Sequence, residues 1–386
     1  MSVTKASDYR IFLGGGLQHE VTNVLKCQYR ESATLPGGWY IEMDPDVQTN
    51  LTSAMPFVNG MRFGVMDLTA DKWDYVGVRF QNPRGAMYTD LMDGPSGKRA
   101  VFRGTDLRGY LAHRVVEPYF AAQSHYQIGG DVGNVVATLL DDQCGVGAIP
   151  TARRFSNVTF TVLESFAGST SVNSRFRYSN LLDSVRSLLD QHLQQDGEYT
   201  WLETRLGTNA STGDFDGWTC GVSRYGTTTA HKLFPSMGDV SERAQLASVR
   251  QQTWAYVLGD GSGHTRTLRE NSDASVSPTV SGWERLEHVL DLGQSGATTT
   301  EIDGIVKGLY DPGFEAELVT PGPDAPNMNV GDTVQYPAQD GSLITHRVTE
   351  KLTTIENGKV LRQYQLSGGG NSDPLLSNPI TLPDYD

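Results

Sequence analysis

The chain has 386 residues, 38% of them hydrophobic, with a formal net charge of −14 and a mean hydropathy of −0.37. This length predicts two or three domains, and the composition is that of a soluble protein with enough apolar residues for a core. No apolar run approaches the roughly 20 residues that a membrane helix needs, and the first residues lack the features of a signal peptide. We therefore expect a protein that folds in the cytoplasm without a membrane anchor.

Residues 1–118 are predicted to form a β domain. Short segments rich in aromatic and β-branched residues alternate with Gly, Pro, Asn and Asp. Such spacing favours a barrel or a sandwich. A short helix or turn over 105–116, capped by Thr105 or Asp106, is expected to lead out of this domain. The strands are expected at 39–44, 75–80 and 99–104.

Residues 119–240 are predicted to form a mixed α+β domain. Two stretches place apolar residues at i, i+3, i+4 and i+7, the spacing of a helix that packs from one side. The capping residues are Asp131 and Gly145 for the first helix, and Ser179 or Asn180 and Gly197 for the second. His192 lies beside the apolar stripe of the second helix, where a structural histidine is expected. Strands are expected at 157–166 and 198–206.

Residues 241–370 are predicted to form a second β domain. The pairs Asp340-Gly341 and Asn357-Gly358 indicate hairpin turns, because a type I′ turn needs positive φ at both central residues. These turns would join three strands into a meander. The fold class expected for the chain is therefore mainly β with an α+β insert.

Two other features of the C-terminal third are predicted. One exposed helix is expected over 298–313, although Gly304 and Gly308 in its interior disfavour a helix. Residues 371–386 are broken by prolines and asparagines and offer little material for a core. We expect this last segment to be an extended C-terminal arm.

The negative charge is concentrated toward the end of the chain. Residues 1–118 carry 13 Lys and Arg against 13 Asp and Glu, residues 119–240 carry 8 against 12, and residues 241–386 carry 10 against 20. Tight DNA binding needs a basic surface, because the release of counterions drives it. Two explanations remain for the acidic third: ordinary solubility, or a surface that lies near DNA without binding it.

The sequence contains no motif for catalysis, a cofactor or a metal. The nearest match to a phosphate-binding loop has Met92 where the first glycine belongs and Arg99 where Ser or Thr belongs. No Gly-x-Ser-x-Gly, His-Glu-x-x-His or short Cys-x-x-Cys motif occurs. We therefore expect catalytic residues, cofactor-binding residues and metal ligands all to be none, and no cofactor.

Two residue groups invite a functional interpretation and are predicted to be structural. The glycine-rich run 259–263 is not followed by a helical pattern, so a turn between strands is favoured over an anion site. His264 and the arginines that follow would face solvent or an interface. The odd number of cysteines argues against a disulfide framework and favours three buried, reduced thiols. The cysteines are Cys27, Cys144 and Cys220.

A β domain, a mixed insert, a second β domain and a short arm, in this order, resemble the tail-hub (baseplate-hub) proteins of siphophages, notably the ReqiPepy-type siphovirus tail proteins. The stretch VFRGTDLRGYLAHRVVEP at 101–118 is similar to a family strand that ends in glycine, followed by a polar-leucine turn. WAYVLGDGSGHTRTLRE at 254–270 resembles a glycine-rich strand turn followed by arginine. Further similar stretches lie at 176–203, 216–242, 282–291 and 329–354.

The resemblance implies a structural role without catalysis. It implies two tail-tube-like β-barrel domains that flank the middle domain, and a homotrimer whose six barrels form a ring at the virion tail tip. Such a ring joins the sixfold tail tube to the threefold tip and lets genome DNA pass. The implied partners are the distal tail protein ring, the tape measure protein, and tail-tip spike or fibre proteins. An acidic lumen would agree with the charge of the last third.

Two other functions stay open at this point. Exposed tryptophans could stack on sugars in a receptor- or carbohydrate-binding baseplate protein, although core positions are favoured for them. The candidates are Trp39, Trp73, Trp201, Trp218 and Trp283. A tail-associated cell-wall hydrolase is the less favoured alternative, because no nucleophile signature occurs and an unplaced carboxylate pair carries no weight.

Overall fold

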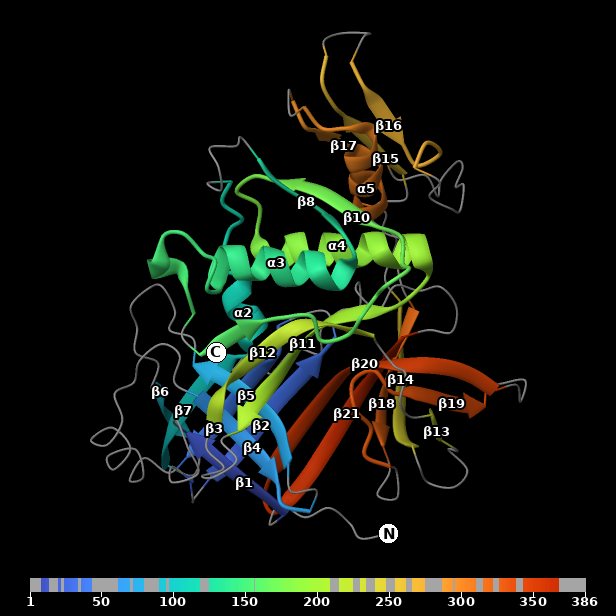
Figure 1. Cartoon of the computed structure of the whole chain (residues 1–386). Helices are drawn as coiled ribbons and strands as arrows, with labels where there is room; N and C mark the ends of the chain where they lie inside the picture. Colours follow the sequence, from blue (N-terminus) through green and yellow to red (C-terminus); the bar gives the residue numbers. More distant parts are fainter. Residues whose placement is uncertain are drawn as a thin grey trace.

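A computed structural model shows a mainly β chain with one large sheet at one end and the helices above it (Figure 1). The structure describes residues 8–13, 20–21, 24–33, 36–43, 62–69, 72–79, 90–94, 97–118, 125–155, 157–208, 215–224, 230–233, 240–247, 254–261, 266–274, 287–293, 296–309, 315–321, 326–337 and 343–367. Asp340-Gly341, His264, Trp283 and the C-terminal arm lie outside these residues.

The N-terminal part of the chain supplies one half of the large sheet, in the order β1-β4-β5-β7-β3-β2, with β6 on β7. Its strands are β1 (Tyr9–Leu13), β2 (Val24–Ser32), β3 (Gly38–Met43), β4 (Arg62–Asp67), β5 (Lys72–Arg79), β6 (Asp90–Gly94) and β7 (Gly97–Thr105). Strands β3, β5 and β7 confirm the three strands expected in this region. The core of this half includes Trp39 stacked on Phe63 with ring centroids 4.3 Å apart.

The C-terminal part supplies the other half, in the order β20-β21-β18-β14, with β19 on β20 and β13 on β19. Its strands are β13 (Ala230–Lys232), β14 (Val240–Ala247), β18 (Glu315–Pro321), β19 (Thr333–Pro337), β20 (Leu343–Glu356) and β21 (Lys359–Ser367). The meander β19-β20-β21 is confirmed. Asn357 and Gly358 both have positive φ, 51° and 74°, as the expected hairpin turn requires.

One strand pair joins the two halves. Strand β2 pairs antiparallel with β20, from Lys26 opposite Glu356 to Ser32 opposite Glu350. A single sheet therefore runs through both of the regions expected to be separate β domains. Among the described strands its order ends at β1 and β14 and does not close into a barrel. The domain boundaries near residues 118, 240 and 370 stay predictions.

A buried lysine lies at this junction. Lys351 on β20 is fully buried, and its Nζ lies 3.6 Å from a carboxylate oxygen of Glu31 on β2 and 3.5 Å from one of Asp74 on β5. The Tyr29 hydroxyl donates to the other oxygen of Asp74. Burial alone would lower the pKa of the Lys351 ammonium, but the two carboxylates outweigh it and raise the pKa above its ordinary value. The junction is thus held by a charged, buried cluster.

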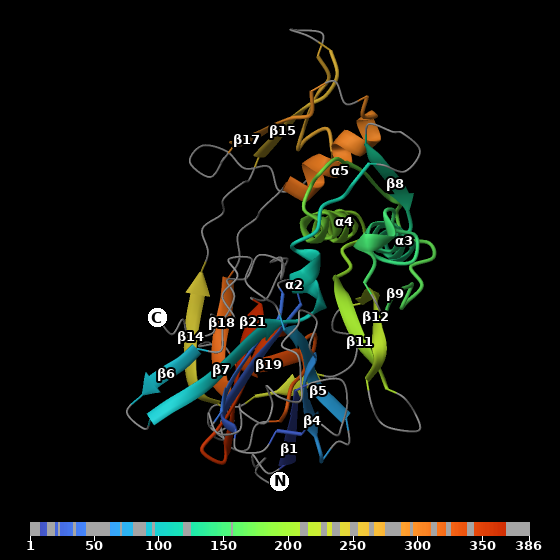
Figure 2. The same cartoon turned by 90° about the vertical axis from the view of Figure 1, so that its left-hand side faces the viewer.

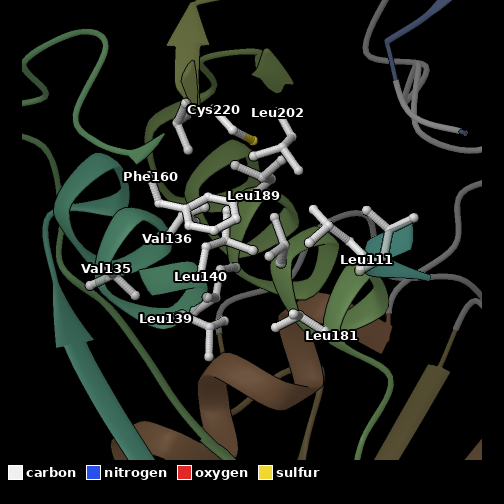
Figure 3. Close-up of a cluster of buried hydrophobic side chains, with 14 of the residues drawn as sticks. Leu111, Val135, Val136, Leu139, Leu140, Phe160, Leu181, Leu189, Leu202 and Cys220 are labelled. Carbon is white, nitrogen blue, oxygen red and sulfur yellow. The ribbon is translucent and has the colours of Figure 1, made fainter. Parts of the chain in front are cut away.

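The middle part of the chain builds a separate core above the sheet. Its helices are α2 (Leu107–Leu111), α3 (Val132–Cys144) and α4 (Leu181–Asp196), with the short 3-10 helix η4 (Thr151–Arg153); its strands are β8 (Tyr126–Gly130), β9 (Val158–Phe160), β10 (Val172–Phe176), β11 (Thr200–Thr208) and β12 (Phe215–Arg224). Figure 3 shows Leu139 of α3, Leu181 of α4 and Leu202 of β11 in one apolar cluster. This packing satisfies the apolar stripes that the helical spacing predicted.

The local capping signals act as the sequence predicts. The carboxylate of Asp106 caps α2, that of Asp131 caps α3, and the Asn180 side chain caps α4. Gly197 ends α4 with φ of 67°, a left-handed conformation that suits glycine. The strand expected over 157–166 is shorter than predicted. Only Val158–Phe160 pair with β12, because the chain leaves the ladder after the Thr161 amide bonds to Cys220.

Residues 254–309 form what we call the apical unit, at the end of the molecule farthest from the large sheet (Figure 2). It contains β15 (Trp254–Leu258), β16 (Leu268–Glu270), β17 (Glu287–Asp291) and α5 (Thr299–Leu309). The helix expected over 298–313 is confirmed as α5, but the expectation that it is exposed is wrong. Ile302 and Val306 of α5 are fully buried against the face of this small sheet, and the opposite side of the helix packs on α4 and β10.

The glycine that lowered the helix propensity of α5 has a packing role. A Cβ on Gly304 would lie 2.8 Å from the Asn173 carbonyl oxygen of β10 and 2.8 Å from the Gln191 side-chain oxygen of α4. Real Cβ contacts are not this short, so only glycine lets the helix approach these elements. Glu301 adds an ion pair with Arg175 of β10 at 3.9 Å.

We predict that Gly304→Ala destabilises the protein. Replacing glycine by alanine in an exposed helix would stabilise it by about 1 kcal/mol, whereas overpacking against the Asn173 carbonyl costs about 1–3 kcal/mol. Urea unfolding should show a lower midpoint for Gly304→Ala. The exposed Thr300→Ala on the same helix is the control and should change stability by less than about 0.5 kcal/mol. A higher midpoint for Gly304→Ala would contradict the close packing.

We predict that Lys351→Met is strongly destabilising, because it leaves the carboxylates of Glu31 and Asp74 without their buried cation. Removal of one partner from a buried charge cluster costs about 3–5 kcal/mol. The control is Lys359→Met, which changes an exposed lysine of the neighbouring strand β21. The urea midpoints of both variants measure the difference. Equal midpoints would show that the cluster does not stabilise the junction.

Candidate functional site

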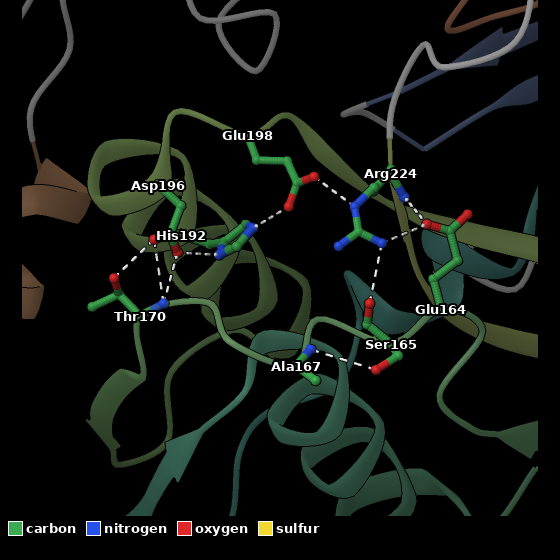
Figure 4. A network of polar contacts seen from close by, with 8 residues as sticks. All are labelled: Glu164, Ser165, Ala167, Thr170, His192, Asp196, Glu198 and Arg224. Atoms are coloured by element: carbon green, nitrogen blue, oxygen red, sulfur yellow. Dashed lines mark hydrogen bonds and ion pairs between the residues drawn. The ribbon is translucent and has the colours of Figure 1, made fainter.

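Among the described residues, a histidine, two carboxylates that flank it and an arginine form a polar network of the kind that catalytic sites use (Figure 4). His192, on the last turns of α4, lies with Nδ1 3.0 Å from Asp196 and Nε2 3.3 Å from Glu198. The other oxygen of Glu198 accepts from Nε of Arg224 on β12 at 2.5 Å. The backbone N–H of Arg224 donates to Glu164 at 2.9 Å. The network links the end of α4 to the end of β12.

This network is built for structure rather than for chemistry on a substrate. His192 has no exposed surface, and the Phe166 ring covers it edge-on with centroids 5.5 Å apart. The Arg224 guanidinium lies 4.4 Å above the same ring. Each ring nitrogen of His192 therefore faces a carboxylate of the protein itself, and a substrate has no access to it. This burial agrees with the structural histidine expected from the sequence.

The described part of the glycine-rich run, residues 259–261, directly follows strand β15, which agrees with the predicted turn between strands. Strand β15 ends at Leu258 and pairs antiparallel with β16, whose Leu268 lies opposite Leu258. The arginines of this stretch keep part of their side chains exposed and also form ion pairs within the protein. Arg266 forms an ion pair with Asp291 of β17, and Arg269 holds Asp303 of α5 with two contacts of 2.6 Å. Both arginines thus fasten the apical unit together.

The three cysteines are far from the chemistry expected of reactive thiols, because all of them are buried. All three cysteines are free and buried, as expected. Burial raises the pKa of the Cys144 thiol to about 11, so it is protonated at neutral pH. Within the described ranges, no group of three or more His, Cys, Asp or Glu residues could hold a metal ion. None of the described helices is both long and apolar enough to cross a membrane.

The tryptophans that could have stacked on sugars are divided between core and partly buried positions. Trp39 and Trp218 are buried in the two largest apolar clusters, so they cannot present a face to a ligand. Trp73 lies edge-on against Phe12 with centroids 5.2 Å apart, and Trp201 is half-buried. The described tryptophans therefore do not gather into a platform for carbohydrate.

The strands at the two ends of the main path of the large sheet, β1 and β14, are the candidate assembly surface; the side branches end at β6 and β13. Strand β14 pairs with β18, and its other side carries no described strand. At the opposite end, β1 pairs with β4, while a short bridge covers part of its outer side, where the Val21 amide donates to the Ile11 carbonyl at 2.7 Å. Edge strands present N–H and C=O groups that can pair with another chain. These edges offer geometry for assembly rather than groups for catalysis.

Known proteins resemble this chain in structure, but none of the sequence comparisons finds a match. No family model matches the chain, and no characterised protein matches it by sequence. The tail protein from Neisseria meningitidis MC58 is similar in structure, with a TM-score of 0.55 at 10% identity over 95% of this chain and 99% of that one. The 43 kDa tail protein of prophage MuSo2 from Shewanella oneidensis gives 0.49 at 11% identity, over 95% and 99%. The chain therefore shares its fold with the tail protein from Neisseria meningitidis MC58.

Proposed function

We propose that this chain is a structural tail-hub protein of a long-tailed, siphophage-type bacteriophage. Three copies form a pseudo-sixfold ring at the tail tip, between the distal tail protein ring and the spike or fibre proteins. The ring also meets the tape measure protein and lets genome DNA pass through its lumen. The observation that carries this proposal is the fold shared with a solved tail protein over nearly the full length of both chains.

The open sheet supports assembly into a ring. Both ends of the sheet, β1 and β14, belong to one copy, so an edge of one copy is available to pair with the other edge of its neighbour. Head-to-tail pairing of this kind closes into a ring when the rotation between copies permits. It would complete the two tail-tube-like barrels and remove the exposed edges at the same time.

The charge of the C-terminal third and the burial of His192 agree with a conduit. Residues 241–386 carry 20 acidic against 10 basic side chains, and an acidic wall repels the phosphates of passing DNA. Among the described residues, His192 is fully buried, and both of its ring nitrogens face carboxylates of the protein. A structural role without catalysis is therefore favoured over the cell-wall hydrolase, and the buried Trp39 and Trp218 disfavour sugar binding at those positions.

The test is the mass of the purified chain in solution, alone and with the distal tail protein ring. We expect three times the monomer mass of 42.2 kDa, either for the free protein or after binding to the ring. Light scattering after size-exclusion chromatography measures it, and an unrelated acidic protein of similar mass, mixed with the ring, serves as the control for non-specific binding. A chain that stays monomeric and does not bind the ring would overturn the tail-hub proposal.

A further inference from the structure

The small sheet of the apical unit has apolar side chains on both of its faces. This apical sheet runs in the order β16-β15-β17, and the side chains along each strand alternate between the two faces. Ala255 and Val257 of β15 are buried in one cluster with Ile302 and Val306 of α5. Helix α5 lies between the apical sheet and α4 (Figure 2). The inner face of the sheet is therefore covered by the protein itself.

The opposite face carries four apolar side chains in two adjacent rows. Tyr256 lies opposite Val289 of β17, and Leu258 lies opposite Leu268 of β16. Directly opposed residues share a face and lie close enough to touch, so the four side chains form one continuous surface, which we call the outer patch. Val289 is 57% exposed and Leu268 50%, and Tyr256 and Leu258 are partly exposed. The outer patch is therefore apolar surface that remains in contact with solvent.

The strand pairing of the apical sheet favours a cover on this second face. Strands β15 and β17 pair in parallel along their whole length. Parallel strands are usually buried on both faces and read as nearly continuous apolar runs, whereas strands with one solvent face alternate apolar and polar residues. Strand β15, with the sequence WAYVL, has the continuous pattern. The sequence of β15 thus matches a strand that is covered from both sides, and α5 provides one of the two covers.

Carboxylates flank the outer patch on the same face. The register places Glu270 of β16 on one side of it and Glu287 and Asp291 of β17 on the other. Asp291 pairs with Arg266, whereas Glu270 accepts the uncharged indole N–H of Trp254 at 3.3 Å. The apical unit as a whole carries 8 acidic against 4 basic side chains, a net charge of −4. Because opposite charges across an interface give specificity, the outer patch fits an occupant that is apolar and basic.

The same charge disfavours two other occupants. Nucleic acid binds to basic surfaces, because its phosphates must be neutralised. The outer patch of a second copy would bring its own carboxylates against these carboxylates, and like charges across an interface are costly. An apolar centre that includes an aromatic side chain, with a polar rim, is instead the composition of an interface between two different proteins.

We propose that the outer patch of the apical sheet binds another protein through a segment that carries aliphatic side chains flanked by lysine or arginine. The aliphatic side chains cover Leu268, Val289 and the Tyr256 ring, and the basic groups meet Glu270 and Glu287. The inference goes beyond the tail-hub proposal and does not depend on it, because the outer patch uses no residue of the sheet edges β1 and β14 that the ring would use.

Calorimetric titration of the full-length chain tests the proposal, with a synthetic amphipathic helical peptide of leucine and lysine as the probe. We expect the parent to bind this peptide at about 0.15 M salt, where distant charges are screened. The double variant Leu268→Ser with Val289→Ser should bind at least about tenfold more weakly, because it removes two apolar contacts. The matched control is Leu361→Ser on β21, where the parent side chain is also 57% exposed, and it should bind as the parent does. Failure of the parent to bind, or an equal affinity of the double variant, would overturn the proposal.

Two further measurements separate the possible occupants. A peptide with glutamate in place of lysine should not bind, and equal binding of both peptides would contradict the selection by charge. Light scattering should give the same mass for the parent and the double variant, whereas a lower mass for the variant would show that a second copy covers the patch. Urea midpoints check the fold, and the two single variants replace the double variant if its midpoint falls. Trimers of both proteins without peptide binding would overturn this proposal and leave the tail-hub proposal intact.

Discussion

The pairing of β2 with β20 is the contact on which the rest of the structure depends. It joins segments that are more than three hundred residues apart, as the hydrogen bond from Gln28 to Thr354 shows, and closing so long a loop is entropically costly. A wrong register would turn every side chain to the other face. Lys351 disfavours such a register shift, because the observed register places its ammonium between Glu31 and Asp74. A buried charge is costly without partners, so the cluster favours one arrangement over its neighbours.

Everything between the two halves is built outward from that sheet. Asp106 accepts the Gly37 amide at 2.9 Å and pairs with Arg108, so α2 is fastened to the sheet where the chain leaves it. The apolar faces of α3 and α4 then cover the small sheets of the middle part. The apical unit is inserted between β14 and β18 and returns to α4 through Gly304. The layers form one continuous stack in which each packs on the one below (Figures 1 and 2).

This organisation explains why the described residues show no accessible reactive centre. His192 and Lys351 are fully buried, and the partly buried groups around them are paired with them or with one another, so these contacts stabilise the register of the elements. Among the described strands, the backbone edges of β14 and, in part, of β1 are left for interaction. A protein that works by fitting against neighbours needs a rigid frame and specific surfaces, and both are present here.

The sequence by itself determined the local features. The caps at Asp131 and Asn180, the left-handed Gly197 and the Asn357-Gly358 turn each depend on a few neighbouring residues, so local pattern was sufficient for them. The tertiary structure alone decided three others: the shared sheet of the two halves, the burial of α5, and the partners of Arg266 and Arg269. Gly304 shows the reason. The sequence alone shows that a glycine lowers the helix propensity at this position. The close packing that requires a glycine appears only in the tertiary structure, where Asn173 and Gln191 approach it from distant segments.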